Sequence, residues 1–393
     1  MPKIVGFAPK LMASTRVGRV QATKDTNTSQ FSVAVFSSSP YVEEFLEPHF
    51  QDFRTTYIPS RLDAGSVRFA EGHDVVCNFV NDECDAEILK VLSGMGVRMV
   101  ANRCAGYDRV DLSAAKELGI AVARVPTYSP ESVAEAGLCL LLATARNLRS
   151  ATLKVAVGNY TLDGLVGTQL YVLITQARVF FDNNACLFLI RVFYRSGKTF
   201  GVIGTGAIGT AFIRLLGGFH GKVLAYDLYP NDAAVEAGAE YVEMDRLLAE
   251  SDVISLHTPL LPSTKHIICR DSLAKMKDNS ILINVSRGGL IDTESLVDMI
   301  VDGSCGVRAV GMDVYEDEES LFFTDFTDQS PRQRMKKWDA KFQLLKSLPQ
   351  VVVTPHTAFL TEEALAAIGA TTRANIEQVL NGQHCPNLVQ SQY

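Results

Sequence analysis

Short apolar runs alternate with helical stretches along most of this chain. In its first part, the runs "FSVAVFS", "HDVVCNFV", "VRMVAN" and "IAVAR" are rich in β-branched residues and end in turn residues, which is typical of buried strands. The segments between them, "YVEEFLEPHF", "DAEILKVLSG" and "DLSAAKELG", predict helices. Strands that alternate with helices indicate parallel strands joined by crossover connections. The pattern therefore predicts an α/β fold.

A second set of strands follows later in the chain, in "KTFGVIG", "GKVLAYD", "DVISLHTP", "SILINVS", "RAVGMDVY" and "QVVVTPH". Between the two sets, one long helix is predicted over 131–156, with Pro130 as its start. The last helical stretch, "TEEALAAIGATTRANIEQVLNG", ends at Asn381 and Gly382, a common helix stop. Two sets of strands in a chain of 393 residues predict two domains.

Composition narrows the class of partner. The chain is 47% hydrophobic and 21% charged, and its net charge is −7 with no basic stripe, so binding to nucleic acid is not expected. The 8 cysteines are scattered, with no Cys-x-x-Cys and no Cys/His pair at metal-ligand spacing, which predicts free thiols in a reducing compartment and no metal site. We therefore expect a small-molecule partner and a cytoplasmic protein.

Two segments resemble membrane or targeting signals. The stretch 167–199 is apolar, but Arg178, Asp182 and two further arginines divide it into runs too short to span a membrane; no membrane association is predicted. Residues 1–30 form an N-terminal extension with several basic residues and no acid before Asp25. A disordered basic tail is predicted there, and a mitochondrial presequence is the alternative.

A glycine-rich turn opens the second set of strands. In "TFGVIGTGAIG", Gly204-x-Gly206-x-x-Gly209 joins an apolar strand to a helical segment. Such glycines let the backbone approach a pyrophosphate at the helix N-terminus. The next strand ends at Asp227, where an acid can bind the adenosine ribose and would repel a 2′-phosphate. We predict NAD as the cofactor, and a ligand-free glycine turn is the alternative. The predicted cofactor residues are Gly204, Gly206, Ala207, Ile208, Gly209 and Asp227.

Three ionisable residues follow strands of the second set. Arg287 follows "SILINVS", Glu316 follows "RAVGMDVY" and His356 follows "QVVVTP"; ligands of open parallel sheets bind at these strand ends. A guanidinium can hold a substrate carboxylate, and an imidazole charged by a neighbouring carboxylate can exchange a hydroxyl proton. Hydride exchange between nicotinamide and a 2-hydroxy acid needs these groups. The alternatives are a surface arginine, a solvated acidic loop over 316–319 and a loop histidine.

The segments around these residues, "NVSRGGLID", "GMDVYEDE" and "TPHTAFLTEEA", closely resemble the NAD-dependent D-isomer-specific 2-hydroxyacid dehydrogenases, and "DEESLFF" is most similar to the D-lactate branch. The resemblance runs from Phe31 to Val389. It implies two Rossmann-like doubly wound parallel-sheet domains with a cleft between them. Residues 31–130 and 363–393 would form the substrate domain and 131–362 the NAD-binding domain. It also implies a homodimer formed through the predicted long helix.

The resemblance further implies a role for each matching residue. Arg287 would bind the substrate carboxylate and polarise the carbonyl, His356 would be the acid/base, and Glu316 would hold and charge the histidine. Backbone amides at Ala105 and Gly106 would add to the carboxylate grip. The remaining implied site residues are Tyr128 in the substrate pocket and His257, Thr258, Pro259 and Asp313 beside the cofactor.

One segment departs from the family pattern. Relatives pass from the glycine matching Gly167 to the first dinucleotide strand within a few residues, whereas here Thr168 to Ser196 intervene. We interpret this atypical insertion, 168–195, as a retained intron or a wrongly joined exon, and a genuine lid or loop is the alternative. If translated, its apolar runs would favour aggregation.

Together these observations predict reversible, NADH-dependent reduction of pyruvate, or a similar 2-oxo acid, to the D-2-hydroxy acid. A non-catalytic NAD(H)-binding regulator on the same fold is one alternative, and an isoform inactivated by the insertion is another. The preferred 2-oxo acid is left open, because homologous substrates differ only in the pocket volume they need.

Overall fold

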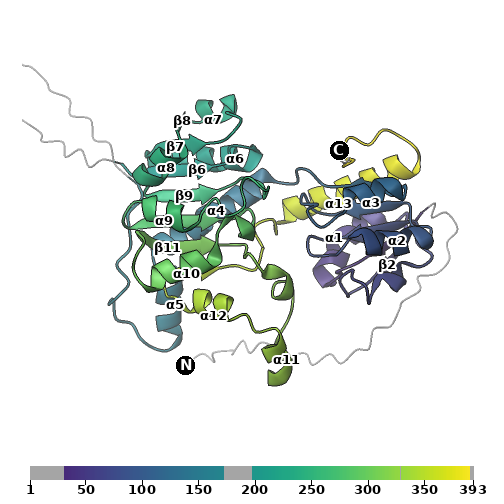
Figure 1. Cartoon of the computed structure of the whole chain (residues 1–393), viewed down its shortest axis with the longest axis horizontal. Coiled ribbons are helices and arrows are strands. Elements are labelled where there is room, and N and C mark those ends of the chain that lie inside the picture. Colours follow the sequence, from purple (N-terminus) through teal and green to yellow (C-terminus); the bar gives the residue numbers. More distant parts are fainter. Residues whose placement is uncertain (1–30, 172–196, 328, 390–393) are drawn as a thin grey trace, which may run out of the picture.

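Two parallel sheets form the framework of the molecule (Figure 1). The computed structural model describes residues 31–171, 197–327 and 329–389. The first sheet has the order β2-β1-β3-β4-β5 and the second the order β12-β11-β10-β9-β6-β7-β8, and the strand pairs in both are parallel. The predicted α/β fold with two parallel-sheet domains is confirmed.

The strands of the first sheet are β1 (Ser32–Val35), β2 (Arg54–Tyr57), β3 (Val75–Asn78), β4 (Met99–Asn102) and β5 (Ala121–Ala123). Those of the second are β6 (Thr199–Ile203), β7 (Lys222–Tyr226), β8 (Ala239–Tyr241), β9 (Val253–Leu256), β10 (Ser280–Asn284), β11 (Val307–Met312) and β12 (Val351–Val353). The central strands are buried throughout, because helices cover both faces of a doubly wound sheet.

The helices of the first domain are α1 (Pro40–Phe50), α2 (Ala86–Gly94), α3 (Leu112–Glu117) and α13 (Glu362–Leu380). The helices of the second domain are α4 (Pro130–Ala145), α5 (Leu148–Ala156), α6 (Ala207–Leu216), α7 (Asp232–Glu236), α8 (Met244–Glu250), α9 (Arg270–Lys275), α10 (Thr293–Val301), α11 (Pro331–Lys336) and α12 (Ala340–Ser347). Short 3₁₀ turns lie at Val67–Ala70, Gly217–Phe219, Gly288–Leu290 and Glu318–Ser320.

The predicted helix over 131–156 is two helices. Asn147, between α4 and α5, has φ 49° in the left-handed region, which asparagine tolerates better than most residues. Its side-chain Nδ2 donates to the carbonyl of Val166, 2.9 Å away. The break turns α5 away from the direction of α4, and α5 buries none of its residues in this chain.

The chain crosses between the two domains twice. The first crossing leads into α4, and the second returns the chain to α13, which packs against α1 and β4 of the first domain (Figure 1). At the starts of these two helices, the Ser132 and Thr361 hydroxyls are hydrogen-bonded at 2.7 Å. The two crossing segments are therefore joined side by side.

The start of the atypical segment belongs to the fold. The Thr168 amide donates to the Ala145 carbonyl at 2.7 Å, Leu170 is buried in the core of the second domain, and the Tyr171 ring packs on His220. Residues 168–171 of the predicted insertion, 168–195, thus pack on the second domain. The rest of it, and the 1–30 extension, lie outside the described residues. In the described part of the chain, no helix is long and apolar enough to cross a membrane.

Candidate active site

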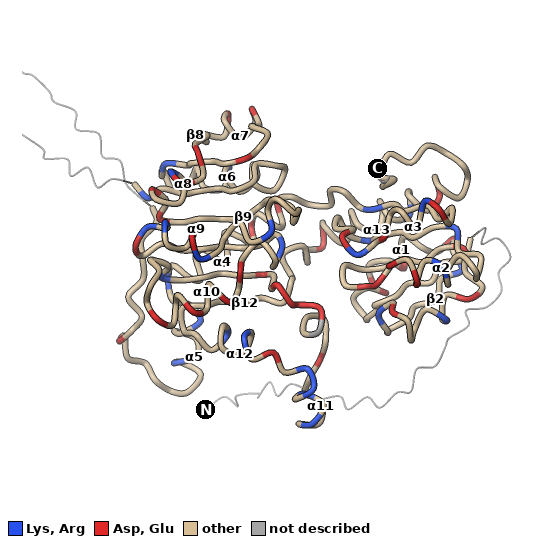
Figure 2. Tube along the Cα trace, viewed as in Figure 1, with Lys and Arg blue, Asp and Glu red and all other residues tan. Residues whose placement is uncertain are grey.

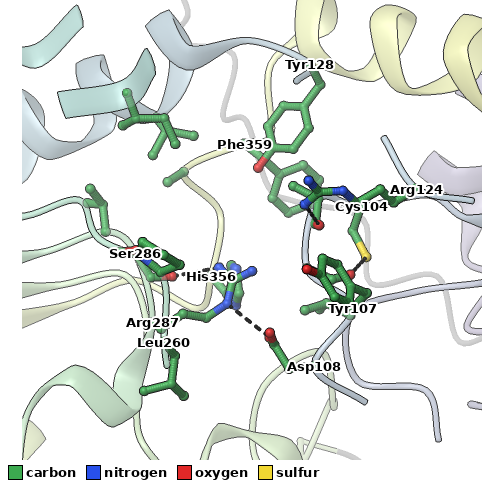
Figure 3. Close-up of a pocket in the computed structure, with 18 of the residues that line it drawn as sticks. Cys104, Tyr107, Asp108, Arg124, Tyr128, Leu260, Ser286, Arg287, His356 and Phe359 are labelled. Carbon is green, nitrogen blue, oxygen red and sulfur yellow. Dashed lines mark hydrogen bonds and ion pairs between the residues drawn. The ribbon is translucent and has the colours of Figure 1, made fainter. Parts of the chain in front are cut away.

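A cavity of 430 Å³ lies between the two domains (Figure 3). On the first domain it is bordered by the loop after β4, which includes Ala105 and Gly106, and by Tyr128. On the second domain, its wall includes loops at the carboxyl ends of the strands. The predicted site residues on that wall are Ile208, His257, Pro259, Arg287, Asp313 and His356. Residues far apart in the sequence are thus brought to one cavity.

The glycine turn has the geometry of a dinucleotide cradle. Gly204 has φ 93°, and a β-carbon there would lie 2.6 Å from the backbone of His257 and Thr258. A β-carbon at Gly209 would lie 2.0 Å from the Gly204 carbonyl oxygen, whereas the space beside Gly206 is open. Only glycine fits at Gly204 and Gly209. Gly206 leaves the N-terminus of α6 accessible to a phosphate.

Asp227 lies beside this turn at the end of β7. Its Oδ2 accepts a hydrogen bond from the Thr205 amide at 2.7 Å, and its Oδ1 accepts one from the Tyr229 amide at 3.0 Å. These bonds hold a half-exposed carboxylate next to the glycine turn, where it can accept from ribose hydroxyls. The residues present fit a dinucleotide with an unphosphorylated ribose.

His257 is a neutral member of the cavity wall. Its Nε2 is hydrogen-bonded to the Ser255 hydroxyl at 2.8 Å, and burial lowers its pKa to about 3. Its buried Nδ1 has no partner among the described residues, so it is a polar atom that a bound group can satisfy. The adjacent Thr258 carbonyl accepts from the Ser286 hydroxyl at 2.6 Å, which ties this loop to the segment that carries Arg287.

Arg287 reaches from the second domain toward the first. Its Nε lies 3.5 Å from Oδ2 of Asp108, and its Nη1 donates to the Ser286 carbonyl at 2.9 Å. Its Nη2 faces Gly106, since a β-carbon at that position would lie only 2.4 Å from it. The guanidinium and the loop of Ala105 and Gly106 therefore border one small region, as a carboxylate site requires.

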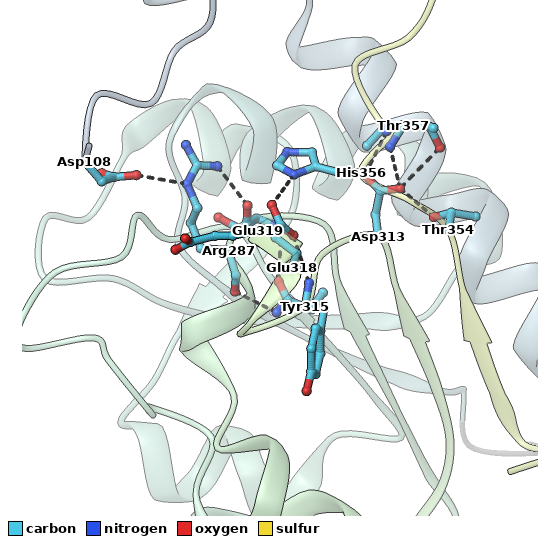
Figure 4. Close-up of polar contacts among 12 residues, drawn as sticks. Asp108, Arg287, Asp313, Tyr315, Glu318, Glu319, Thr354, His356 and Thr357 are labelled. Carbon is cyan, nitrogen blue, oxygen red and sulfur yellow. Dashed lines mark hydrogen bonds and ion pairs between the residues drawn. The ribbon is translucent and has the colours of Figure 1, made fainter. Parts of the chain in front are cut away.

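His356 is held by Glu318, and the prediction that Glu316 holds it is wrong. The Nδ1 of His356 lies 2.7 Å from Oε1 of Glu318 (Figure 4), and Oε2 of Glu318 accepts from the Tyr315 amide at 3.0 Å. Glu316 points elsewhere: its Oε1 accepts from Nε2 of His266 at 2.6 Å. Both residues of the His356–Glu318 pair have side chains less than 15% exposed, at 14% and 12%.

The loop geometry explains the two-residue error. After β11 the chain turns at Glu318–Ser320, so strand alternation no longer sets side-chain direction. The turn aims Glu318 at the cavity wall and leaves Glu316 on the side of α10, whose Thr293 amide lies 3.3 Å from its Oε2. Because residues 316–319 are all acidic, the sequence does not indicate which glutamate contacts His356.

Asp313 fixes the loop that carries His356. This carboxylate is 1% exposed; it accepts from the Thr354 hydroxyl at 2.5 Å and from the Thr357 and Ala358 amides at 2.8 Å each. The His356 amide donates to the Asp313 carbonyl at 2.7 Å, and His356 has φ 56°. A left-handed histidine costs roughly 1–2 kcal/mol, which these bonds offset.

Aromatic side chains close one end of the cavity. The ring of Phe359 lies 5.8 Å from that of Phe79 and 6.3 Å from that of Tyr128, and the Phe323 ring lies 5.9 Å from that of His356. Burial raises the pKa of Tyr128 to about 12, so its hydroxyl stays protonated and can donate. Sequence inspection missed both Phe79 and Phe359, because apolar residues at strand ends look like core.

A dinucleotide turn, a guanidinium and a carboxylate-bound imidazole in one interdomain cavity define a nicotinamide-dependent dehydrogenase of small carboxylic acids. In the described residues, no cluster of three or more His, Cys, Asp or Glu side chains could hold a metal ion. The family model of the D-isomer specific 2-hydroxyacid dehydrogenase NAD binding domain matches residues 189–358.

Relatives of known name match nearly the whole chain. A 2-hydroxyacid dehydrogenase homolog of Haemophilus influenzae is 40% identical over 91% of this chain and 98% of its own. D-lactate dehydrogenase of Escherichia coli is 38% identical over 90% and 98%. The structure of the pyruvate reductase of Chlamydomonas reinhardtii aligns with a TM-score of 0.80 at 45% identity, covering 92% of this chain and 99% of that one. The chain belongs to the NAD-dependent D-isomer specific 2-hydroxyacid dehydrogenases.

Proposed function

We propose that this enzyme reduces pyruvate, or a 2-oxo acid of similar size, to the D-2-hydroxy acid and that the reaction is reversible. The observation that carries the proposal is the shared cavity of Arg287 and His356, with Glu318 bonded to the histidine. The named relatives include a D-lactate dehydrogenase and a pyruvate reductase. Their names support the choice of a three-carbon substrate.

The residues of the cavity then divide the reaction between them. Arg287 and the amides of Ala105 and Gly106 bind the substrate carboxylate, and Arg287 polarises the adjacent carbonyl. His356 gives its proton to the carbonyl oxygen as that oxygen gains charge, and Glu318 stabilises the charged imidazole. Bound NADH supplies the hydride. The buried walls exclude water from the reacting carbon.

The size of the substrate is set by the aromatic end of the cavity. Phe79, Tyr128 and Phe359 present ring surfaces at that end, with the Arg103 guanidinium 4.5 Å from the centre of the Phe79 ring, and we propose that the substrate side chain that contacts these rings is apolar. The methyl group of pyruvate is such a side chain. Longer apolar side chains of other 2-oxo acids would occupy the same part of the cavity. Discrimination between chains that differ by one methylene is modest, about 10–200-fold.

The test is the loss of NADH absorbance with a panel of 2-oxo acids that runs from glyoxylate through pyruvate to branched six-carbon acids. We expect the highest kcat/KM with pyruvate or its nearest homologue. Arg287→Lys keeps the charge but loses the planar fork, so it raises KM for the acid more than it lowers NADH affinity. NADH binding without turnover of any 2-oxo acid would instead support the regulator.

A second test compares the full chain with a chain that lacks most of the atypical insertion. A variant that lacks residues 172–196 keeps Leu170, which packs in the core, keeps Tyr171, whose exposed ring contacts His220, and keeps β6. We propose that this shortened chain is more soluble and at least as active as the full chain. Activity confined to the shortened chain would support the inactive-isoform interpretation, and activity only in the full chain would show that the segment is a functional loop.

We further propose a homodimer in the cytoplasm. The surface of α5 and the loop after it is apolar and exposed in this chain; its members are Leu148, Leu153, Val155, Val157, Tyr160, Leu162 and Val166. An apolar surface of this extent supports coverage by a second subunit. Sedimentation of wild type and Leu153→Glu tests it, with a shift to monomer expected for the variant. The free cysteines among the described residues fit a reducing compartment.

A further inference from the structure

The turn that carries Glu318 is held by both domains. Glu318 itself is anchored within its own domain, through the Tyr315 amide and His356. The next residue, Glu319, is held by the other domain: its carboxylate is paired with the guanidinium of Arg109, and its carbonyl oxygen lies 3.4 Å from Nη1 of Arg61. We call Arg109 and Glu319 the domain-bridging pair.

Arg109 also belongs to the loop that binds the substrate carboxylate. It lies three residues after Gly106 in "CAGYDR", and its carbonyl accepts from the Cys84 amide at 3.2 Å. Its partner Glu319 lies one residue after Glu318. One ion pair thus connects the loop proposed to bind the substrate carboxylate with the turn proposed to charge the acid/base histidine.

The pair lies on the far side of His356 from the substrate cavity. A second interdomain cavity, of 670 Å³, is lined there by His356, Glu318, Glu319, Arg109 and Arg287. The Arg109 side chain is 30% exposed and that of Glu319 is 48% exposed, so solvent still reaches the pair. Opening of the cleft would separate its two halves, because they lie on different domains.

We propose that Arg109 is a positioning residue, which acts through Glu319 to hold Glu318 against His356 when the cleft is closed. This inference rests on the proposed function. The carboxylate that charges His356 takes its final place only when the substrate loop is docked, so proton donation is coupled to closure. The other charged groups around His356 include Arg287 and Asp108, across the shared cavities, and Asp313, which holds its loop.

The first measurement is kcat for the 2-oxo acid in Arg109→Met and Glu319→Gln, each made in the wild type and in Glu318→Gln. We expect each variant to lower kcat by about tenfold, the size of one lost charge-assisted hydrogen bond, with the Kd for NADH unchanged. In the Glu318→Gln background, the further loss is less than about twofold, because residues that act through one another are not additive.

The matched control is Arg270→Met. Arg270 pairs with Asp298 at 3.4 Å, both more than half exposed and both in the second domain; we expect no change in kcat. If Arg109→Met fails to fold, Glu319→Gln still tests the proposal, because the Glu319 side chain is half-exposed and its replacement should leave the fold intact. Equal losses in both Glu318 backgrounds, or equal losses in the control, would overturn the proposal.

A second measurement needs no turnover: the midpoint of the His356 ring titration, followed by NMR in the NAD complex. Removal of the positive charge in Arg109→Met would by Coulomb's law favour the charged imidazole and move the midpoint to higher pH. Loss of a correctly placed Glu318 moves it to lower pH. A downward shift supports the proposal and an upward shift, or none, contradicts it. If the wild type reduces no 2-oxo acid, the proposed function is wrong. The NMR titration, which needs no turnover, then still tests whether Arg109 positions Glu318.

Discussion

The two walls of the cleft are held in different ways. The wall of the second domain is fixed by buried bonds: Asp313, 1% exposed, binds the loop of His356, and Ser286 binds the loop after His257. The wall of the first domain meets the second through ion pairs open to solvent, such as Asp108 with Arg287, where the Asp108 side chain is 54% exposed. Charge also differs little between the domains, since Figure 2 shows both signs spread over each.

Buried polar bonds and exposed ion pairs respond to different conditions. A bond to a desolvated carboxylate is strong and insensitive to salt, and removal of the acceptor leaves unpaired donors. An exposed ion pair is weak and screened by salt. We therefore expect the wall of the second domain to be preformed and the wall of the first domain to be assembled against it when the domains close.

The largest effect is expected at the carboxylate that is bonded to His356. Glu318→Gln should lower kcat for reduction by roughly a hundredfold, because the neutral amide no longer stabilises the charged imidazole. Glu316→Gln, which alters the contacts with His266 and the Thr293 amide but none with His356, is the matched variant and should retain most of the activity. Steady-state kinetics of both variants decide between the two glutamates. A larger loss of kcat in Glu316→Gln than in Glu318→Gln would support Glu316 as the residue that charges His356.

The next largest effect is on stability. Asp313→Ala leaves the Thr354 hydroxyl and the Thr357 and Ala358 amides without their acceptor, so the free energy of unfolding should fall by about 3 kcal/mol. Urea unfolding measures it. Asp325→Ala, in which an exposed carboxylate is lost, should unfold as the wild type does; a similar loss in both would mean that the buried network does not fix this wall.

The pH dependence of stability should reveal His257. Burial lowers its pKa from 6.5 to about 3, so between those values the unfolded chain binds more protons than the folded one. The contribution is complete above pH 6.5 and is lost as pH falls, with a slope of at most about 1.4 kcal/mol per pH unit. In His257→Gln, the free energy of unfolding should depend less on pH between about pH 4 and 6. An unchanged slope would show that the imidazole is hydrated.

The smallest effect belongs to the solvent-exposed wall. Asp108→Asn removes a long, exposed contact with Arg287, and KM for the 2-oxo acid should change by less than about threefold. The change should shrink as salt is added. A larger change that persists at high salt would show that this wall, too, is preformed.

The fold was largely predictable because buried parallel strands carry a strong signal. The runs from "FSVAVFS" to "QVVVTPH" each contain a strand, whereas β2 ("RTTY") and β8 ("AEY") escaped notice. Both are edge strands, half-exposed and polar, so their pattern is that of a loop. The break at Asn147 was missed because the apolar positions continue on both sides of it.

The site was predictable where the backbone dictates it. The glycine turn depends on positions at which a β-carbon would collide, and Arg287 and His356 follow strands whose ends must meet at one sheet edge. The choice between Glu316 and Glu318 depends on a turn two residues beyond the strand. Its direction follows from the local bond to the Tyr315 amide and from tertiary contacts with His356 and the opposing domain, which leave no periodic pattern in the sequence.

The paired crossings joined by Ser132 and Thr361 restrict how the cleft can move. With two adjacent covalent connections, one domain can swing about the line through them but cannot easily slide or twist along the other. Each closure by such a swing would return the far rim to the same register, with Arg287 and His356 in the same relative position. We therefore expect the motion of the cleft to be mainly a hinge swing, and a motion restricted in this way would preserve the geometry at the reacting carbon.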